Sequence, residues 1–176
     1  MGAERQTGRL AKKKAKRPAR HTPTVVVGWN EFIDLPAWGV AGLHAKIDTG
    51  ARSSSLHVED FEILPDNEVS FSVPLGLPSH RWQRVTAGIT RTSHVRSSNG
   101  QRSLRYFVTT TLALGGIQTE IELNLVDRGD MRFPMLIGRT ALAHHYIVDP
   151  GRRCLASERP KKVPKVPPHK VRKKDR

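Results

Sequence analysis

The stretch LHAKIDTGARSSSLH (residues 43–57) runs from a short apolar segment into the tripeptide Asp48-Thr49-Gly50. Aspartate and glycine are common turn formers, so the tripeptide alone is compatible with a surface turn. Its surroundings favour a more specific interpretation, because the segment HAKI delivers the aspartate and Ala51 follows the glycine. The question is therefore whether Asp48 closes a turn or belongs to a pair of catalytic carboxylates.

A second element with an unusual pattern lies about 90 residues further along the chain. In FPMLIGRTALA (residues 133–143), apolar residues and Gly138 precede Arg139 and then Thr140, a residue that favours helix starts. Neither element is specific alone, whereas the two in this order form a distinctive pair.

The region between the two chain ends is predicted to be rich in β-strands, because short β-branched and aromatic segments alternate with turn signals. The clearest unit is a hairpin in which residues 104–114 and 117–126 flank Gly115-Gly116, a pair that tolerates the positive φ angles of tight turns. Alternation predicts one apolar face on each strand. These faces are Tyr106, Val108, Thr110, Leu112 and Leu114 on the first strand, and Ile117, Thr119, Ile121, Leu123 and Leu125 on the second.

One segment favours a helix. TALAHHY (residues 140–146) is long enough for about two turns, with Thr140 as its N-cap and Pro150 as a later stop. Many short strands, an alternating segment with Val69, Phe71 and Val73 on one face, and one late helix predict a small β domain, closed or sandwich-like.

Charge divides the chain into a neutral centre and two basic ends. Residues 1–21 and 156–176 together hold 17 Lys and Arg against 3 acids, whereas residues 22–155 hold 13 of each sign, so the ends account for the whole net charge of +14. Ends of this composition bury too little apolar surface to order themselves. We expect disordered basic tails at residues 1–22 and 156–176 around one domain at residues 23–155. Such tails attract nucleic acid, the ribosome or another polyanion, or serve only as solubilising segments, and no base-reading motif accompanies them.

Several other chemistries have no motif behind them. Cys154 is the only cysteine, which excludes an intrachain disulfide and fits a reducing, cytoplasmic compartment. We expect no membrane span and no signal peptide. No zinc motif, P-loop or G-x-S-x-G elbow occurs, so no metal and no cofactor is expected. One alternative stays open, in which His44 and His57 join Asp48 around a metal ion.

The two elements resemble the two halves of the retropepsin signature, an apolar strand ending in Asp-Thr/Ser-Gly-Ala and a later Ile/Leu-Ile-Gly-Arg that opens the single helix. The chain is more closely similar to a bacterial retropepsin-like family often labelled ATP-dependent zinc proteases. The shared motifs are VGWNEFIDLP, KIDTGARSSSLH, SSNGQRSLRYFV, MRFPMLIGR and a closing VDP, and they cover roughly residues 25–150. The zinc and ATP of that label have no motif here. The family's link to ATP is explained by its association with an ATP-grasp ligase that adds glutamates to a ribosomal protein.

The resemblance implies a mainly β, single retropepsin-like closed β-barrel domain with one short C-terminal helix. It also implies an aspartic-type endopeptidase, in which two carboxylates share one proton and activate a water. Because the chain has one Asp-Thr-Gly, the pair requires Asp48 from each of two chains at a homodimer axis.

The resemblance also assigns roles to the residues around Asp48. Thr49 would hydrogen-bond across the dimer axis, and Gly50 would bring its amide to the carboxylate. Position 138 would have no room for a side chain, and Arg139 would form a salt bridge within the fold. The expected structural support of the catalytic loop is Ala51, Ile137, Gly138 and Arg139.

Residues 74–103 occupy the place of the retropepsin flap, although this segment is longer and more polar than a retroviral flap. Four of its residues are arginines, Arg81, Arg84, Arg91 and Arg96. They suggest an acidic peptide substrate, for example a glutamate-rich one, and a solvated charged loop is the alternative. Two other functions stay open. One is a retropepsin-like dimerisation or binding domain without turnover, and the other is a ribosome- or nucleic-acid-associated protein that acts through its tails.

Overall fold

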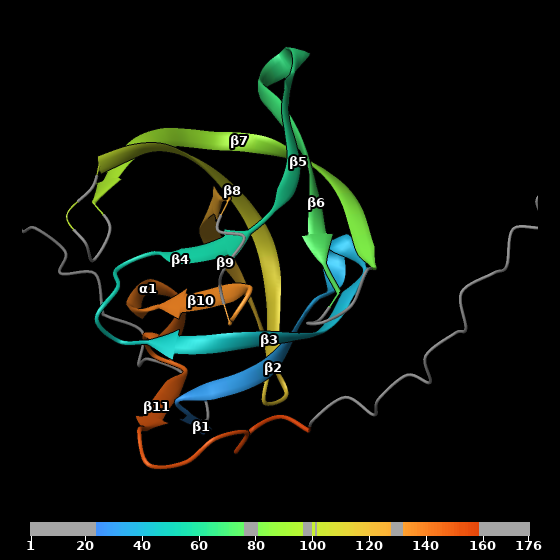
Figure 1. The fold of residues 1–176 in the computed structure, drawn as a ribbon. Coiled ribbons are helices and arrows are strands. Elements are labelled where there is room, and N and C mark those ends of the chain that lie inside the picture. The colour runs from blue at the N-terminus through green and yellow to red at the C-terminus, as the bar shows by residue number, and fades with distance from the viewer. Residues whose placement is uncertain (1–23, 76–80, 97–99, 101, 128–131, 159–176) are drawn as a thin grey trace, which may run out of the picture.

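The computed structural model describes residues 24–75, 81–96, 100, 102–127 and 132–158 (Figure 1). Most of both predicted tails lies outside these ranges, and so do residues 76–80, 97–99 and 101 of the proposed flap segment. The prediction of disordered tails therefore stays a prediction. In the described ranges, no helix is long and apolar enough to cross a membrane.

The described chain is mainly β with one short α-helix, α1 (Arg139–Leu142), as predicted. Nine strands form one sheet in the order β2-β3-β10-β4-β9-β8-β7-β6-β5, and β1 (Val25–Gly28) pairs in parallel with β11 (Tyr146–Asp149) in a second sheet. Two 3-10 helices, η1 (Pro36–Trp38) and η2 (Pro65–Asn67), connect strands. The nine strands are β2 (Asn30–Leu35), β3 (Val40–Asp48), β4 (Ser54–His57), β5 (Glu59–Leu64), β6 (Glu68–Pro74), β7 (Trp82–Arg96), β8 (Arg102–Leu114), β9 (Ile117–Val126) and β10 (Met135–Gly138).

The long sheet curls back on itself. Strand β2 pairs with β8 at Asp34 and Ala113, so the six strands β2-β3-β10-β4-β9-β8 return to their starting point. The barrel that we expected to be closed is thus joined between these two strands by one residue pair. Strands β7, β6 and β5 continue the sheet beyond this ring, and Figure 1 shows β7 arching over it with the β5–β6 hairpin projecting at the top.

The inward faces of these strands form the core. Val69, Phe71 and Val73 are completely buried, as their alternation predicted. The predicted face of β8 is buried at Val108, Thr110, Leu112 and Leu114, and that of β9 at Ile121, Leu123 and Leu125. Tyr106 on β8, and Ile117 and Thr119 in the first part of β9, are half-buried. The outward face of β9 carries mostly polar residues, and the outward face of β8 carries Phe107, which is buried and lines the groove described below.

The predicted β8–β9 hairpin is confirmed. The strands pair antiparallel from Leu114 and Ile117 to Phe107 and Asn124. Gly115 and Gly116 make the turn with φ angles of 58° and 78°, the left-handed region that glycine adopts without strain.

The helix is shorter than the two turns predicted for residues 140–146. It begins at Arg139 with Gly138 as its N-cap, so Thr140 lies inside the first turn rather than capping it. The helix ends at Leu142 because Ala143 leaves the helical region at ψ 137° and His144 takes a positive φ of 71°. Strand β11 then starts at Tyr146, which shows that pairing with β1 takes precedence over helix propensity here.

The folded chain continues past residue 155, the boundary predicted from composition. Glu31 on β2 is completely buried, and its carboxylate accepts hydrogen bonds from the amide groups of Leu155 and Ala156 and from the hydroxyl of Ser157. The same carboxylate accepts a bond from the amide of Gly28 at 2.6 Å. Glu31 therefore ties the C-terminal segment to the start of the domain.

Much of the proposed flap segment is regular structure rather than a loop. Strand β7 runs for 15 residues, pairs with β6 through its first half and pairs with β8 from Ile89 to Arg96. Only its connections, residues 76–80 and most of 97–101, lie outside the described ranges.

Candidate active site

The parallel pairing of β3 and β10 brings the two sequence elements together. Ile137 lies opposite Ile47 and Gly138 opposite Asp48, so the end of β10 meets the end of β3 where the Asp-Thr-Gly loop begins. In Figure 1 the two strands run side by side, with α1 at the end of β10. The fold therefore places helix α1 directly against the loop that carries Asp48.

The carboxylate of Asp48 is held by its own loop. Its Oδ1 atom accepts hydrogen bonds from the backbone amides of Gly50 at 3.0 Å and Ala51 at 3.1 Å. Its Oδ2 atom accepts none from any described residue, and the side chain is partly exposed. One oxygen is thus fixed in position, while the other can bind a water or a substrate.

Arg139 fixes the outside of the same loop. Its Nη1 group donates to the carbonyl oxygens of Thr49 and Gly50, both at 2.9 Å, and its backbone amide donates to the carbonyl of Ala51 at 2.9 Å. We expected a salt bridge, but in the described residues this guanidinium binds backbone carbonyls instead. The arrangement satisfies carbonyls that a tight loop cannot pair with its own amides.

Gly138 lies where no side chain fits. A Cβ atom there would come within 2.6 Å of the carbonyl carbon and oxygen of Ser53 and 2.8 Å of the carbonyl oxygen of Arg52. The backbone amide of Gly138 also donates a hydrogen bond to Ser54 Oγ at 3.2 Å. Ile137, one residue earlier, is completely buried beneath the loop.

Thr49 is exposed at the tip of the loop. The resemblance to retropepsins implied that its hydroxyl contacts a second chain, and that role stays a prediction. Its exposure leaves the hydroxyl accessible to such a partner.

A groove of about 610 Å³ opens beside this loop. Arg52 and Ser53 from the loop and Thr140 and Ala141 from α1 line one side of it, and the other sides come from β7, β8 and β9. Asp48 is not among the described lining residues, so the groove lies to one side of the carboxylate rather than over it. The lining on the three strands is Arg91, Ser93, His94, Val95, Phe107, Glu120, Ile121 and Glu122.

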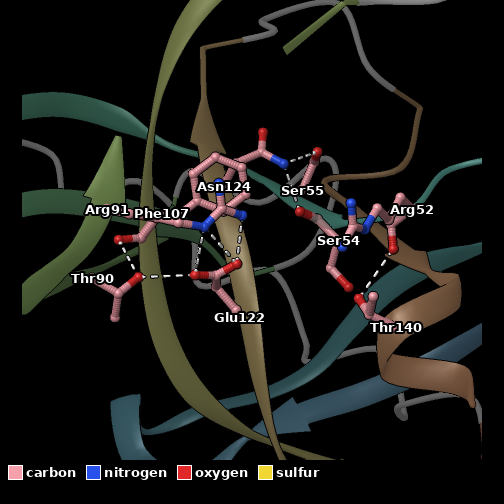
Figure 2. Close-up of polar contacts among 9 residues, drawn as sticks. All are labelled: Arg52, Ser54, Ser55, Thr90, Arg91, Phe107, Glu122, Asn124 and Thr140. Carbon is pink, nitrogen blue, oxygen red and sulfur yellow. Dashed lines mark hydrogen bonds and ion pairs between the residues drawn. The ribbon is translucent and has the colours of Figure 1, made fainter. Parts of the chain in front are cut away.

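The far wall of the groove is an ion pair stacked on an aromatic ring (Figure 2). Arg91 binds both oxygens of Glu122, with Nη2 to Oε2 at 2.6 Å and Nε to Oε1 at 3.0 Å, and its guanidinium lies 3.5 Å from the centre of the Phe107 ring. Hydrogen bonds from Arg91, with the charge of Arg91 and a bond from Thr90 in smaller roles, hold the pKa of Glu122 below its ordinary value.

A β-bulge positions this wall. The register between β7 and β8 shifts between Ile89 and Arg91, so Thr90 is the extra residue. Its hydroxyl donates to the carbonyl of Phe107 at 3.0 Å and to Glu122 at 3.2 Å, beside the Arg91 bonds in Figure 2. Our sequence interpretation missed Arg91, Phe107 and Glu122 as a unit, although the polar alternation of residues 118, 120, 122 and 124 on β9 was a visible signal.

Asn124 continues that polar face toward the loop. It is buried, and its Nδ2 donates to the carbonyl of Ser54 and to the hydroxyl of Ser55, both at 2.7 Å (Figure 2). This amide couples β9 to β4, the strand that follows the Asp48 loop.

The two histidines considered as metal ligands are engaged elsewhere. His44 Nε2 pairs with Asn30 Oδ1 at 3.1 Å and its ring stacks on Phe32, whereas His57 is buried beside Glu59 and Trp82. Within the described ranges, no three His, Cys, Asp or Glu side chains come together as a metal site would require. The alternative of a zinc site built from His44, His57 and Asp48 therefore has no geometry behind it in this part of the chain.

The curled sheet, the Asp-Thr-Gly loop and the Gly-Arg element against it define a protein of the retropepsin-like class. Comparison with family models gives the particular group: residues 26–159 match the RimB-like family, described as retropepsin-like aspartic endopeptidase RimB, and the chain belongs to that family.

The curated relatives that match this chain carry another activity in their names. The chain is 32% identical over 138 residues to a probable alpha-L-glutamate ligase of Shewanella pealeana, covering 76% of this chain and 30% of the ligase. It is 34% identical over 135 residues to a protein of the same name from Parasynechococcus marenigrum, covering 73% of this chain and 28% of the relative. The chain thus spans about 30% of the length of these relatives.

A solved structure shares the fold. The crystal structure of Lpg0085, a Legionella pneumophila protein of unknown function, superimposes with a TM-score of 0.65 at 24% identity, covering 77% of this chain and all of that chain. At this identity the similarity supports the architecture and carries no statement about activity.

Proposed function

We propose that this protein is an aspartic-type endopeptidase whose active site is completed when two chains bring their Asp48 carboxylates together. The observation that carries the proposal is the state of that carboxylate. One oxygen is held by the amides of Gly50 and Ala51, the other accepts no bond from the described residues, and Arg139 clamps the loop from outside. Membership of the RimB-like family supports the same assignment.

The chemistry needs two carboxylates at close range. Because two like charges cannot both ionise there, the pair shares one proton. The ionised member removes a proton from a bound water, whose oxygen attacks the peptide carbonyl carbon while the protonated member hydrogen-bonds the carbonyl oxygen. The C–N bond then breaks, and the leaving nitrogen takes a proton from the pair.

A homodimer is the simplest source of the second carboxylate. An isologous two-fold axis would place the same loop from each chain face to face. The exposed Thr49 would then contact its copy in the partner, and the amides of Gly50 and Ala51 would orient both carboxylates alike.

For the substrate we propose acidic peptide or protein tails. The groove beside the loop presents Arg52, which is exposed and pairs with no acidic group in the described ranges, and the relatives are named as probable alpha-L-glutamate ligases. An ATP-grasp glutamate ligase is therefore the proposed functional partner, with the ligase adding residues that this protein removes. A cytoplasmic setting, in which Cys154 stays reduced, belongs to the same proposal.

The deciding experiment compares the full-length wild type with Asp48→Asn on a peptide library analysed by mass spectrometry. Asparagine keeps an Oδ1 acceptor for the amides of Gly50 and Ala51, so the loop should keep its conformation while the acid–base pair is lost. We expect cleavage by the wild type, none by the variant, and dimers of both in sedimentation. A wild type that cleaves no peptide and sediments as a monomer would leave a binding domain without turnover as the better description.

The basic tails support a second, separate activity. They hold 17 Lys and Arg against 3 acids, a composition that attracts polyanions such as the ribosome or nucleic acid. Truncation of both tails should weaken such contacts and leave peptide cleavage unchanged, and unaltered cellular partners after truncation would remove this part of the proposal.

A further inference from the structure

The groove beside the catalytic loop holds two arginines in opposite states. Arg91 is occupied, because its guanidinium binds both oxygens of Glu122 and stacks on Phe107. Arg52 lines the opposite side, is exposed, and its guanidinium makes no hydrogen bond or ion pair with any residue in the described ranges. One cation in this groove is therefore available to a ligand.

We propose that Arg52 selects a peptide by binding one acidic side chain at a position to one side of the scissile bond. The inference rests on the proposed peptidase function and adds the residue that reads the substrate. A guanidinium offers a planar pair of donors that matches a carboxylate in two parallel hydrogen bonds. A peptide with glutamine in place of the acidic residue would lose the negative charge and one of these two hydrogen bonds.

The backbone of Arg52 is already fixed. Its carbonyl oxygen accepts hydrogen bonds from the amide of Thr140 at 3.1 Å and from the hydroxyl of Thr140 at 3.0 Å (Figure 2). Gly138 packs against the same carbonyl, and the Ala51 carbonyl is bound by the Arg139 amide. Binding a carboxylate thus requires only the Arg52 side chain to become ordered, which keeps the entropic cost low.

The position of Arg52 relates recognition to catalysis. Arg52 lies four residues after Asp48 on one continuous loop, and the groove that it lines leaves Asp48 outside. A peptide bound with its scissile bond at Asp48 would reach Arg52 with a side chain further along its length. The selected residue is therefore one near the cleaved bond, rather than one of the two residues joined by it.

The opposite wall restricts where the acidic side chain can bind. Glu120 and Glu122 on β9 both line the groove, and Glu122 already forms an ion pair with Arg91. A substrate carboxylate against this wall would meet two like charges, whereas the same group at Arg52 meets an available cation. Specificity then comes from attraction at Arg52 and repulsion at the two glutamates of β9. The groove therefore favours an acidic side chain at one position of the peptide and disfavours one at others.

The test measures peptide binding to full-length Asp48→Asn, which cannot turn over its ligand under the proposed mechanism. The probes are short peptides with one glutamate placed at successive positions, each matched to a peptide with glutamine there, at physiological salt. We expect one position at which glutamate binds about tenfold tighter than glutamine, the size that one charge-assisted hydrogen bond supplies.

Variants at two arginines then assign the effect. Arg52→Gln in the Asp48→Asn background should abolish the preference at that position, and Arg52→Lys should keep part of it, because lysine retains the charge without the paired donors. Arg153→Gln is the matched control, since Arg153 is exposed and lies outside the groove. The proposal is overturned if no position shows the preference, if Arg52→Gln retains it, or if Arg153→Gln removes it equally.

A gain-of-function variant tests the groove from the other side. Glu122→Gln should release Arg91 and remove one like charge, so a glutamate should become favoured at a second position. Failure of this variant to change the pattern would contradict the role assigned to the β9 wall.

Failure of this proposal is distinguishable from failure of the peptidase proposal. A wild type that cleaves nothing, together with Arg52-dependent binding, would overturn the peptidase and leave Arg52 as a recognition residue. Cleavage by the wild type, with rates equal for glutamate and glutamine peptides, would overturn the role of Arg52 alone.

Discussion

The Asp48 loop and the Arg91 wall face the same groove, yet different kinds of contact hold them. The loop is fixed by backbone groups: amides hold the Asp48 carboxylate, and Arg139 and Thr140 bind loop carbonyls. The wall is fixed by side chains, an Arg91–Glu122 pair whose members are 43% and 37% exposed. The difference implies that a substitution in the loop disturbs several backbone contacts at once and lowers stability strongly. A change of one charge in the wall should alter the groove with little loss of stability.

The largest effect is expected at Gly138. Gly138→Ala places a Cβ within 2.6 Å of the Ser53 backbone, which cannot move without displacing the Asp48 loop. We expect a loss of about 3 kcal/mol in the free energy of unfolding, the upper end of the usual cost of overpacking, measured by chemical denaturation. Gly88→Ala is the control, because a Cβ at Gly88 meets nothing within 4 Å. Equal stability of the two variants would contradict the tight packing beneath the loop.

A substitution at Arg139 should lower stability less than one at Gly138, but it should clearly loosen the Asp48 loop. Lysine cannot bind the carbonyls of both Thr49 and Gly50 with the fork geometry of a guanidinium. Arg139→Lys should therefore speed hydrogen exchange at the amides of Gly50 and Ala51 and lower any peptidase rate, while unfolding shifts by only about 1 kcal/mol. Exchange at Val108 and Leu112 in the core serves as the internal reference, and uniform acceleration there would mean global rather than local loosening.

Glu31 tests whether a buried side chain can hold a chain segment in place as firmly as backbone contacts hold the Asp48 loop. Glu31→Gln keeps one acceptor oxygen but presents an amide to the Ser157 hydroxyl, which already accepts from the amide of Phe32. We expect a loss of about 1–3 kcal/mol in unfolding free energy, the cost of an impaired buried polar group, and faster exchange at Leu155 and Ala156. Glu68→Gln, at an exposed carboxylate, should leave both measurements unchanged.

The same contrast explains how much the sequence could predict. The packing of Gly138 and Arg139 against the Asp48 loop was predictable, because both elements are short contiguous motifs, while the catalytic role of Asp48 stays a prediction. The β8–β9 hairpin was predictable because its turn residues are local. Pairs such as Arg91 with Glu122, and Glu31 with residues 155–157, depend on which distant strands meet and on a bulge that sets the register. The length of α1 was predicted wrongly for the same reason, since the pairing of β11 with β1 competes for residues that favour a helix.

The smallest effect concerns the wall itself and depends on pH. Arg91 holds the pKa of Glu122 below its ordinary value of 4.5, so the ionised carboxylate is favoured in the folded state. A carboxyl group with a lowered folded-state pKa stabilises the fold above its unfolded pKa, and this contribution disappears as the pH falls through the folded pKa.

Because both partners are partly exposed, we expect only about 0.5 kcal/mol from the pair. The wild type should therefore lose slightly more unfolding free energy than Glu122→Gln on acidification from neutral pH to below 4.5, with the difference reduced by salt. Parallel stability curves for the two proteins would mean that the pair shapes the groove without stabilising the fold, and would strengthen the contrast with the backbone-held loop.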